Sequence, residues 1–137
     1  MIYVVGLGPG GRDQITERAL EALEACDVIV GYKAYIALIR PFYKGRARLV
    51  ESAMKQERAR CEEVLALAEA GNTVGLVSSG DPGIYGMAGI MLEVAAGRAE
   101  VRIIPGITAA ASAGAILGAP LTHDFAVVSL SDLLTPW

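Results

Sequence analysis

The chain has 137 residues, 53% of them hydrophobic and 20% charged, and its formal net charge is −3 at pH 7. The length is that of one domain, and the hydrophobic share, above the usual range of about 45–50%, excludes an intrinsically disordered chain. The negative charge argues against a general nucleic-acid binder, whose surface is normally basic.

Short β-branched runs alternate with helical patterns along the chain. In chain order they predict a strand at residues 2–6, a helix at 16–26, a strand at 27–31, a helix at 33–40, a strand at 46–51 and a helix at 55–70. A strand at 73–78, a helix at 84–96, a strand at 100–104, a helix at 108–117 and a strand at 125–130 follow. Continuously apolar strands are typical of parallel sheets. We therefore expect an α/β fold: a doubly wound, mostly parallel sheet with helices on both faces.

Neither a secretion signal nor a membrane span is predicted. The first residues lack the basic segment that opens a signal peptide. Residues 103–122 carry no charge over a length that could cross a bilayer, but prolines and glycines interrupt them. We expect a buried helix there and a cytoplasmic protein. Cys26 and Cys61 lie in apolar helical patterns, so we expect two buried thiols, not a disulfide or metal ligands.

The turn after the first strand, GLGPGG at residues 6–11, matches the GxGxxG pattern of dinucleotide-binding proteins. Two features argue against that function. The next helix starts only near Thr16, so its N-terminus would not meet a pyrophosphate. The second strand ends on Gly31 instead of on the acidic residue that binds the ribose. A turn of purely structural glycines is the other interpretation of this loop.

Two more glycine-bearing loops follow strands. In the loop at residues 78–86, Asp81-Pro82-Gly83 is a strong turn signal, and the Asp81 carboxylate is suited to accept hydrogen bonds from a ligand. In the loop at 105–109, Thr108 is a candidate helix N-cap. Because the carboxyl ends of parallel strands meet at one edge of a sheet, the three loops together predict a ligand pocket.

The pocket is expected to serve a reaction that needs neither a metal nor a protein nucleophile. The chain contains no GxxxxGK[ST] phosphate loop, and its single histidine, His123, has no neighbouring histidines with which to bind a metal. Methyl transfer from a sulfonium fits these limits, since the cofactor supplies the electrophile and the protein positions it.

At these loops the sequence resembles the tetrapyrrole methylase family. The resemblance is carried by VGLGPG at residues 5–10, DVIVGY at 27–32, VSSGDPGIYGMAG at 77–89, IPGITAA at 104–110 and the stretch 118–137, which ends SDLLTPW. It extends from one end of the chain to the other. The last stretch indicates the branch of the family that methylates carbon 17 of a precorrin ring and promotes contraction of the macrocycle.

The resemblance implies an enzyme of cobalamin biosynthesis that uses S-adenosyl-L-methionine as methyl donor and a tetrapyrrole (precorrin) as substrate. It implies a homodimer with no metal, nucleic-acid or membrane partner. Family members have two α/β domains with the cofactor between them. Residues 1–137 are therefore expected to form the N-terminal domain, and a second domain is expected after residue 137. Without it we expect little or no turnover.

The resemblance also implies site residues. Those expected to contact S-adenosylmethionine, mostly through the backbone, are Gly8, Pro9, Ser79, Gly80, Asp81, Ile84, Tyr85, Thr108 and Ala109. No catalytic base carries over, because Tyr32 stands where a relative has an aspartate. Tyr32, His123 and Asp124 are candidates for the proton steps of ring contraction, although His123 and Asp124 also fit a loop-capping role.

Seven basic residues between Arg40 and Arg60 form the remaining feature. Such a run is usually a solvated face, but it could instead bind the carboxylates of a polycarboxylate macrocycle, with Arg46 and Arg48 among the contacts. Two functional alternatives also stay open. One is a truncated, non-catalytic cofactor-binding domain, and the other is a sister methylase acting on ribosomal RNA or on a protein.

Overall fold

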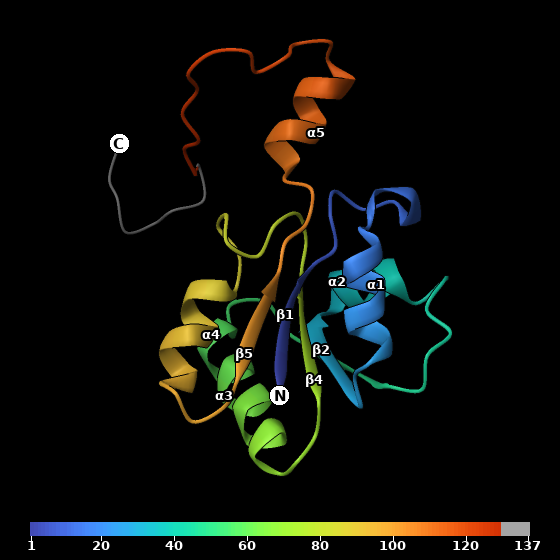
Figure 1. Cartoon of the computed structure of the whole chain (residues 1–137), viewed down its shortest axis with the longest axis vertical. Helices are drawn as coiled ribbons and strands as arrows, with labels where there is room; N and C mark the ends of the chain where they lie inside the picture. The colour runs from blue at the N-terminus through green and yellow to red at the C-terminus, as the bar shows by residue number, and fades with distance from the viewer. Residues whose placement is uncertain (130–137) are drawn as a thin grey trace.

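The computed structural model describes residues 1–129. Its elements are β1 (Ile2–Gly6), the 3-10 helix η1 (Arg12–Gln14), α1 (Glu17–Glu24), β2 (Val28–Tyr32), α2 (Lys33–Ile39), β3 (Arg48–Ser52), α3 (Glu57–Glu69), β4 (Val74–Ser78), α4 (Ala88–Ala95), β5 (Val101–Ile104) and α5 (Ala109–Ile116). The strands form one parallel sheet in the order β3-β2-β4-β1-β5 (Figure 1). The predicted α/β fold is confirmed.

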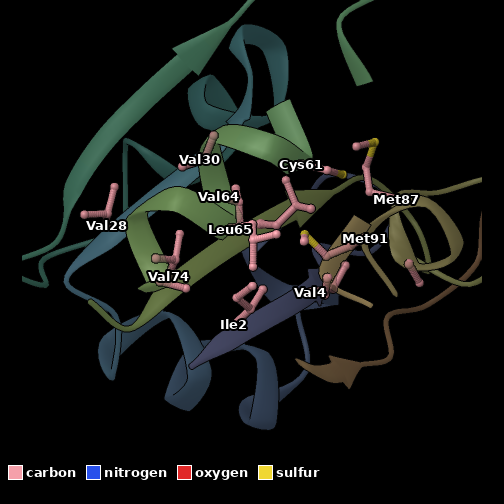
Figure 2. Packing of buried hydrophobic residues seen from close by; sticks show 14 residues of the cluster. Ile2, Val4, Val28, Val30, Cys61, Val64, Leu65, Val74, Met87 and Met91 are labelled. Carbon is pink, nitrogen blue, oxygen red and sulfur yellow. The ribbon is translucent and has the colours of Figure 1, made fainter. Parts of the chain in front are cut away.

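Helices cover both faces of the sheet, which explains why its inner strands are apolar along their whole length. Successive strand residues point to opposite faces, so Val4 packs toward α3 and α4 while its neighbour Val5 packs toward α1 and α2. Figure 2 shows the first of these layers, where Leu65 of α3 and Met91 of α4 lie against Ile2 and Val4 of β1.

The neighbouring strands β1 and β4 send the chain in opposite directions. From β1 it passes through α1 to β2 on one side of the sheet, and from β4 it passes through α4 to β5 at the opposite edge. The helices that follow these adjacent strands, α1 and α4, therefore lie on opposite faces of the sheet. In doubly wound sheets this reversal of direction opens the crevice where ligands bind.

Two of the predicted helices differ from the structure. The helix predicted at 84–96 begins only at Ala88, because Ala88 N–H donates to Pro82 O and the chain before it turns through Tyr85 at φ 52°. The helix predicted as buried within 103–122 is α5, of which only Ser112 is buried, while Ile116 is 79% exposed. It extends from the end of β5 away from the sheet (Figure 1) and so has no layer to pack against.

The strand predicted at 125–130 is also wrong where the structure describes it. Residues 125–129 form no strand, and residue 130 lies outside the described residues. Their β-branched composition fits a strand, but they follow α5, which carries the chain away from the sheet, and they find no strand to pair with (Figure 1). Within residues 1–129, no helix is long and apolar enough to cross a membrane.

Both cysteines are free and buried, as predicted. Burial raises the pKa of the Cys26 thiol to about 12 and that of the Cys61 thiol to about 11, from an ordinary value of 9.0. We expect iodoacetamide at pH 8 to leave both unmodified in the folded chain and to alkylate both after unfolding in urea, as measured by intact mass. Labelling of the native chain at the rate of a free thiol would contradict the packing.

The same shifts predict how stability depends on pH. Because the pKa of each thiol is higher in the folded chain, the unfolded chain releases the thiol protons first as the pH rises. The contribution of the buried thiols to the free energy of unfolding is therefore complete below pH 9 and decreases as the pH rises toward 11 and 12. The urea midpoint should therefore decrease from pH 8 to pH 10. A chain with Cys26→Ala and Cys61→Ala should lose less stability over the same interval.

Candidate functional site

Two of the three glycine loops are joined directly by their backbones. Gly8 N–H donates to Gly80 O at 3.1 Å and Gly80 N–H donates to Gly8 O at 2.7 Å, which ties the loop after β1 to the loop after β4. Both glycines have positive φ, 69° and 61°, a conformation that other residues adopt only with strain. A Cβ atom on Gly8 would also lie 2.5 Å from the Gln14 carbonyl oxygen.

The third loop, after β5, packs against the other two without side chains between them. A Cβ atom on Gly6 would lie 2.6 Å from the Gly106 nitrogen and 2.7 Å from the Gly80 carbonyl oxygen. Both distances are shorter than real Cβ contacts. The backbones of the three loops can therefore approach one another only because these positions are glycines.

Asp81 fixes the second loop to the third. One oxygen of its carboxylate accepts from Gly83 N–H at 2.8 Å and the other accepts from Gly106 N–H at 3.0 Å. The first bond is the Asx-type turn that the Asp-Pro-Gly sequence predicts. The second joins residues that are distant in the sequence, and sequence reasoning gave no indication of it.

The three loops surround a cavity of about 400 Å³, within the range of about 300–1,000 Å³ that is typical of ligand sites. It is lined by Pro9, Ser79, Gly80, Asp81, Ile84, Tyr85, Thr108 and Ala109, which are eight of the nine residues predicted to contact a cofactor, and by Ala110 and Val127. The ninth, Gly8, does not line it but holds Gly80 in place. We name this space the loop cavity.

Residues after α5 complete the loop cavity on one side. The Tyr85 hydroxyl donates to the Val127 carbonyl oxygen at 3.0 Å. The sequence offered no signal for this contact, since Val127 was predicted to lie in a strand. Thr108 is the N-cap of α5, as predicted, and its hydroxyl accepts from Ala110 N–H at 3.4 Å.

A second cavity of about 200 Å³ lies beside the first and shares Ser79 and Tyr85 with it. We name it the arginine cavity, because Arg60 lines it. Tyr32, one of the candidates for proton transfer, lines it too and packs edge-on against Tyr35 with ring centroids 5.4 Å apart.

The other two candidates for proton transfer lie elsewhere. His123 and Asp124 are exposed in the segment after α5 and line neither the loop cavity nor the arginine cavity. The 118–137 stretch that indicates the family branch is described only as far as Ser129, and its SDLLTPW ending lies outside the described residues.

The basic run is mostly a solvated face, with one exception. Arg40 pairs with Glu51 at 2.6 Å on the surface, and Arg46 and Arg48 are exposed. Arg60 alone is buried, with 4% of its surface exposed. Sequence reasoning grouped it with its exposed neighbours. Its spacing, four residues before the buried Val64 on α3, was the signal that could have separated it.

The first turn does not have the geometry of a dinucleotide site. The 3-10 helix η1 follows the glycines, and α1 begins at Glu17 with Thr16 as its N-cap, accepting from Ala19 N–H at 3.2 Å. The glycine run is therefore followed directly by a single 3-10 turn and not by the N-terminus of an α-helix. Among residues 1–129, no group of three or more His, Cys, Asp or Glu side chains is placed to hold a metal ion.

Known proteins match the whole chain. The family described as tetrapyrrole (corrin/porphyrin) methylases matches residues 1–137. A protein of Salmonella typhimurium named "probable cobalt-factor III C(17)-methyltransferase" is 49% identical over 140 residues, which cover 100% of this chain and 58% of that protein.

Solved structures give the same result. The structure titled "Crystal structure of the methyltransferase CobJ" superposes with a TM-score of 0.90 at 40% identity and covers 98% of this chain and 58% of its own. A uroporphyrin-III C-methyltransferase of Thermus thermophilus, solved with S-adenosylhomocysteine, has the same fold, with a TM-score of 0.68 at 24% identity over 89% of this chain and 50% of its own. The chain spans 50–58% of the length of these proteins. On its full-length family match and its parallel sheet with three interlocked glycine loops, the chain belongs to the tetrapyrrole methylase family.

Proposed function

We propose that the chain forms the cofactor-binding side of an S-adenosyl-L-methionine-dependent methyltransferase. The proposed reaction is that of a precorrin-3B C(17)-methyltransferase: methylation at carbon 17 of a precorrin-3 or cobalt-precorrin-3 macrocycle, with ring contraction, in cobalamin biosynthesis. The observation that carries the proposal is the loop cavity, whose lining brings together eight residues from three distant loops. The name of the Salmonella relative supports the choice of carbon 17.

The residues of the loop cavity fit this cofactor. The cavity is large enough for a ligand of this size, and small residues such as Gly80 and Ala109 leave their backbone groups open to contact. When bound, S-adenosylmethionine supplies an electrophilic methyl group, so the chain needs only to bind it, orient it and exclude water. The described residues of the loop cavity fit a role in binding and orienting the cofactor, because the lining contains no pair of carboxylates and no histidine.

The proposal includes a second domain that follows residue 137 and closes the opposite side of the cofactor, and a homodimer as the assembled form. The relatives are long enough to contain such a domain, since this chain covers 58% of the Salmonella protein. We propose no nucleic-acid partner, in keeping with the net charge of −3.

Calorimetry with S-adenosylhomocysteine tests this proposal on two proteins: the 137-residue chain, and the chain joined to the carboxyl-terminal remainder of the Salmonella relative. We expect weak or no binding to the first and tight binding to the second. The two-domain protein should then consume S-adenosylmethionine only when a precorrin-3 substrate is present. Absence of binding to the two-domain protein would refute the proposal, and consumption with ribosomal RNA or a protein instead would favour a sister methylase.

A further inference from the structure

In the part of the chain that the structure describes, Arg60 carries a buried charge with no acidic partner. Its Nε donates to the Ser52 hydroxyl, one terminal nitrogen donates to Ala53 O at 2.8 Å, and the other lies 3.7 Å from Met87 Sδ. Within residues 1–129 no carboxylate lies within 4.0 Å of the guanidinium, not even that of Glu57, which lines the same cavity. A guanidinium has five N–H donors, and two of them meet an oxygen acceptor among the described residues.

This arrangement is unusual for an arginine. Buried arginines are nearly always paired, because an uncompensated charge in the interior is costly. Arg58, two residues earlier on α3, shows the ordinary case: its side chain is 69% exposed and pairs with Glu62 at 3.2 Å and with Glu93 at 3.7 Å. The cost of burying Arg60 unpaired is explained if a ligand provides the missing anion.

A second unsatisfied group lines the same cavity. The hydroxyl oxygen of Ser78, the last residue of β4, is fully buried and has no hydrogen-bond partner among the described residues. Buried polar groups are nearly always satisfied, and exceptions call for an explanation. Arg60 and Ser78 both have donors to offer, so the ligand group that suits them is an acceptor with negative charge.

The size and the rim of the arginine cavity indicate which kind of anionic ligand it could bind. Its volume of about 200 Å³ is below the range of sites that enclose a whole ligand, so it fits one arm of a larger molecule. Around the charged base, Met54, Tyr85 and Ile90 also line the cavity and are exposed by 62%, 68% and 36%. An apolar rim above a buried cation suits a flat apolar ring that carries acidic arms.

We propose that Arg60 and Ser78 bind one peripheral carboxylate of the tetrapyrrole, while the macrocycle lies over the rim formed by Met54, Tyr85 and Ile90. This rests on the proposed function and specifies where its substrate is held. Because the arginine cavity shares Ser79 and Tyr85 with the loop cavity, a ring anchored at Arg60 lies next to the methyl donor.

The test uses porphobilinogen, a single pyrrole that carries one acetate and one propionate arm, as a soluble probe. We expect it to shift the Arg60 side-chain NMR signal of the ¹⁵N-labelled 137-residue chain in a saturable way, and its dimethyl ester to produce no such shift. Arg60→Gln should weaken binding of porphobilinogen by about 10- to 100-fold, in line with the loss of a hydrogen bond to a charged group. The matched control, Arg58→Gln, should change it less than twofold.

A second variant, Ser78→Ala, tests the proposal even if Arg60→Gln fails to fold. Ser78→Ala removes a hydroxyl that has no partner among residues 1–129, so it should leave the thermal midpoint unchanged or higher. It should nevertheless weaken porphobilinogen binding by about two- to tenfold. A purely structural role for these residues predicts the opposite pattern, with stability lowered and affinity unchanged.

The carboxylate could also belong to the cofactor, and a parallel measurement distinguishes the two sources. In the two-domain protein, Arg60→Gln should leave S-adenosylhomocysteine affinity within twofold and raise the KM for the macrocycle at least tenfold. A tenfold loss of S-adenosylhomocysteine affinity would assign the carboxylate to the cofactor and overturn the substrate assignment. Absence of saturable porphobilinogen binding to the wild-type chain, or equal binding of acid and ester, would overturn it as well, while leaving the proposed function intact if S-adenosylhomocysteine still binds.

Discussion

Replacing Gly106 with alanine should abolish S-adenosylhomocysteine binding and destabilise the fold by about 3 kcal/mol, the upper end of the usual cost of overpacking. A Cβ atom there would collide with the Gly80 carbonyl oxygen and lie 2.9 Å from the carbonyl carbon of Gly6. These are backbone atoms of the other two loops, held by strands β1 and β4, so no side chain can rotate away to relieve the contact. The three loops must separate, and the lining of the loop cavity separates with them.

Gly89 provides the matched control. It lies in α4, and a Cβ atom built on it meets nothing within 4 Å. Gly89→Ala should therefore stabilise the chain by at most about 0.5 kcal/mol, the low end of the usual gain because Gly89 lies in the first turn of the helix, and leave S-adenosylhomocysteine affinity unchanged. Urea unfolding of the 137-residue chain and calorimetry on the two-domain protein measure both quantities. If Gly106→Ala had the same stability or the same S-adenosylhomocysteine affinity as Gly89→Ala, the close packing of the three loop backbones would be contradicted.

Asp81→Ala should lower stability by about 2 kcal/mol and weaken S-adenosylhomocysteine binding at least tenfold. The substitution leaves Gly83 N–H and Gly106 N–H without their acceptor, and a hydrogen bond to a charged group contributes about 1.5–3 kcal/mol. Only the bond to Gly106 is partly buried, so the total should stay near the value for one such bond. Asp81→Asn should recover part of the loss at most, because its amide nitrogen cannot accept from either N–H.

Asp27 separates the effect on the site from the loss of a hydrogen bond in general. Its carboxylate also accepts a backbone N–H, from Thr73 at 2.8 Å, but it precedes β2 and so lies at the opposite end of the sheet from the loops. Asp27→Ala should cost about 1 kcal/mol or less, since that bond is exposed, and should not change cofactor affinity. Equal losses of affinity in the two aspartate variants would show that Asp81 has no special part in the loop cavity.

The sequence was sufficient to predict what depends on local pattern. The five strands of the sheet and the N-cap Thr108 lie where they were expected, within a few residues, and the helix expected to start near Thr16 begins at Glu17. The grouping of the three loops into one candidate site was predicted from one topological rule: the carboxyl ends of all strands in a parallel sheet lie at the same edge. That rule predicted which residues meet without any knowledge of the distances between them.

Predictions failed where the outcome depended on long-range packing. The apolar residues 125–129 have no neighbouring strand with which to pair, and α5 has no layer of the fold to cover it. Neither fact can be inferred from the sequence of the segment itself. Arg60 was predicted to be exposed like the basic residues around it in the sequence, although it shares a buried helix face with Val64. The contact from Asp81 to Gly106 joins two loops through one carboxylate oxygen and has no sequence signature.

The pairing of Gly8 with Gly80 has a consequence for the newly made chain. Both sheet neighbours of β1 come later in the sequence, β4 from residue 74 and β5 from residue 101, so β1 leaves the ribosome before either of the strands with which it pairs. Until residue 106 has emerged, the nascent chain has no complete ring of loops with which to hold a nucleoside. Ligand-assisted folding of these residues can therefore begin only after the loop that follows β5 has been made, and earlier intermediates must keep an apolar strand from aggregating without that help.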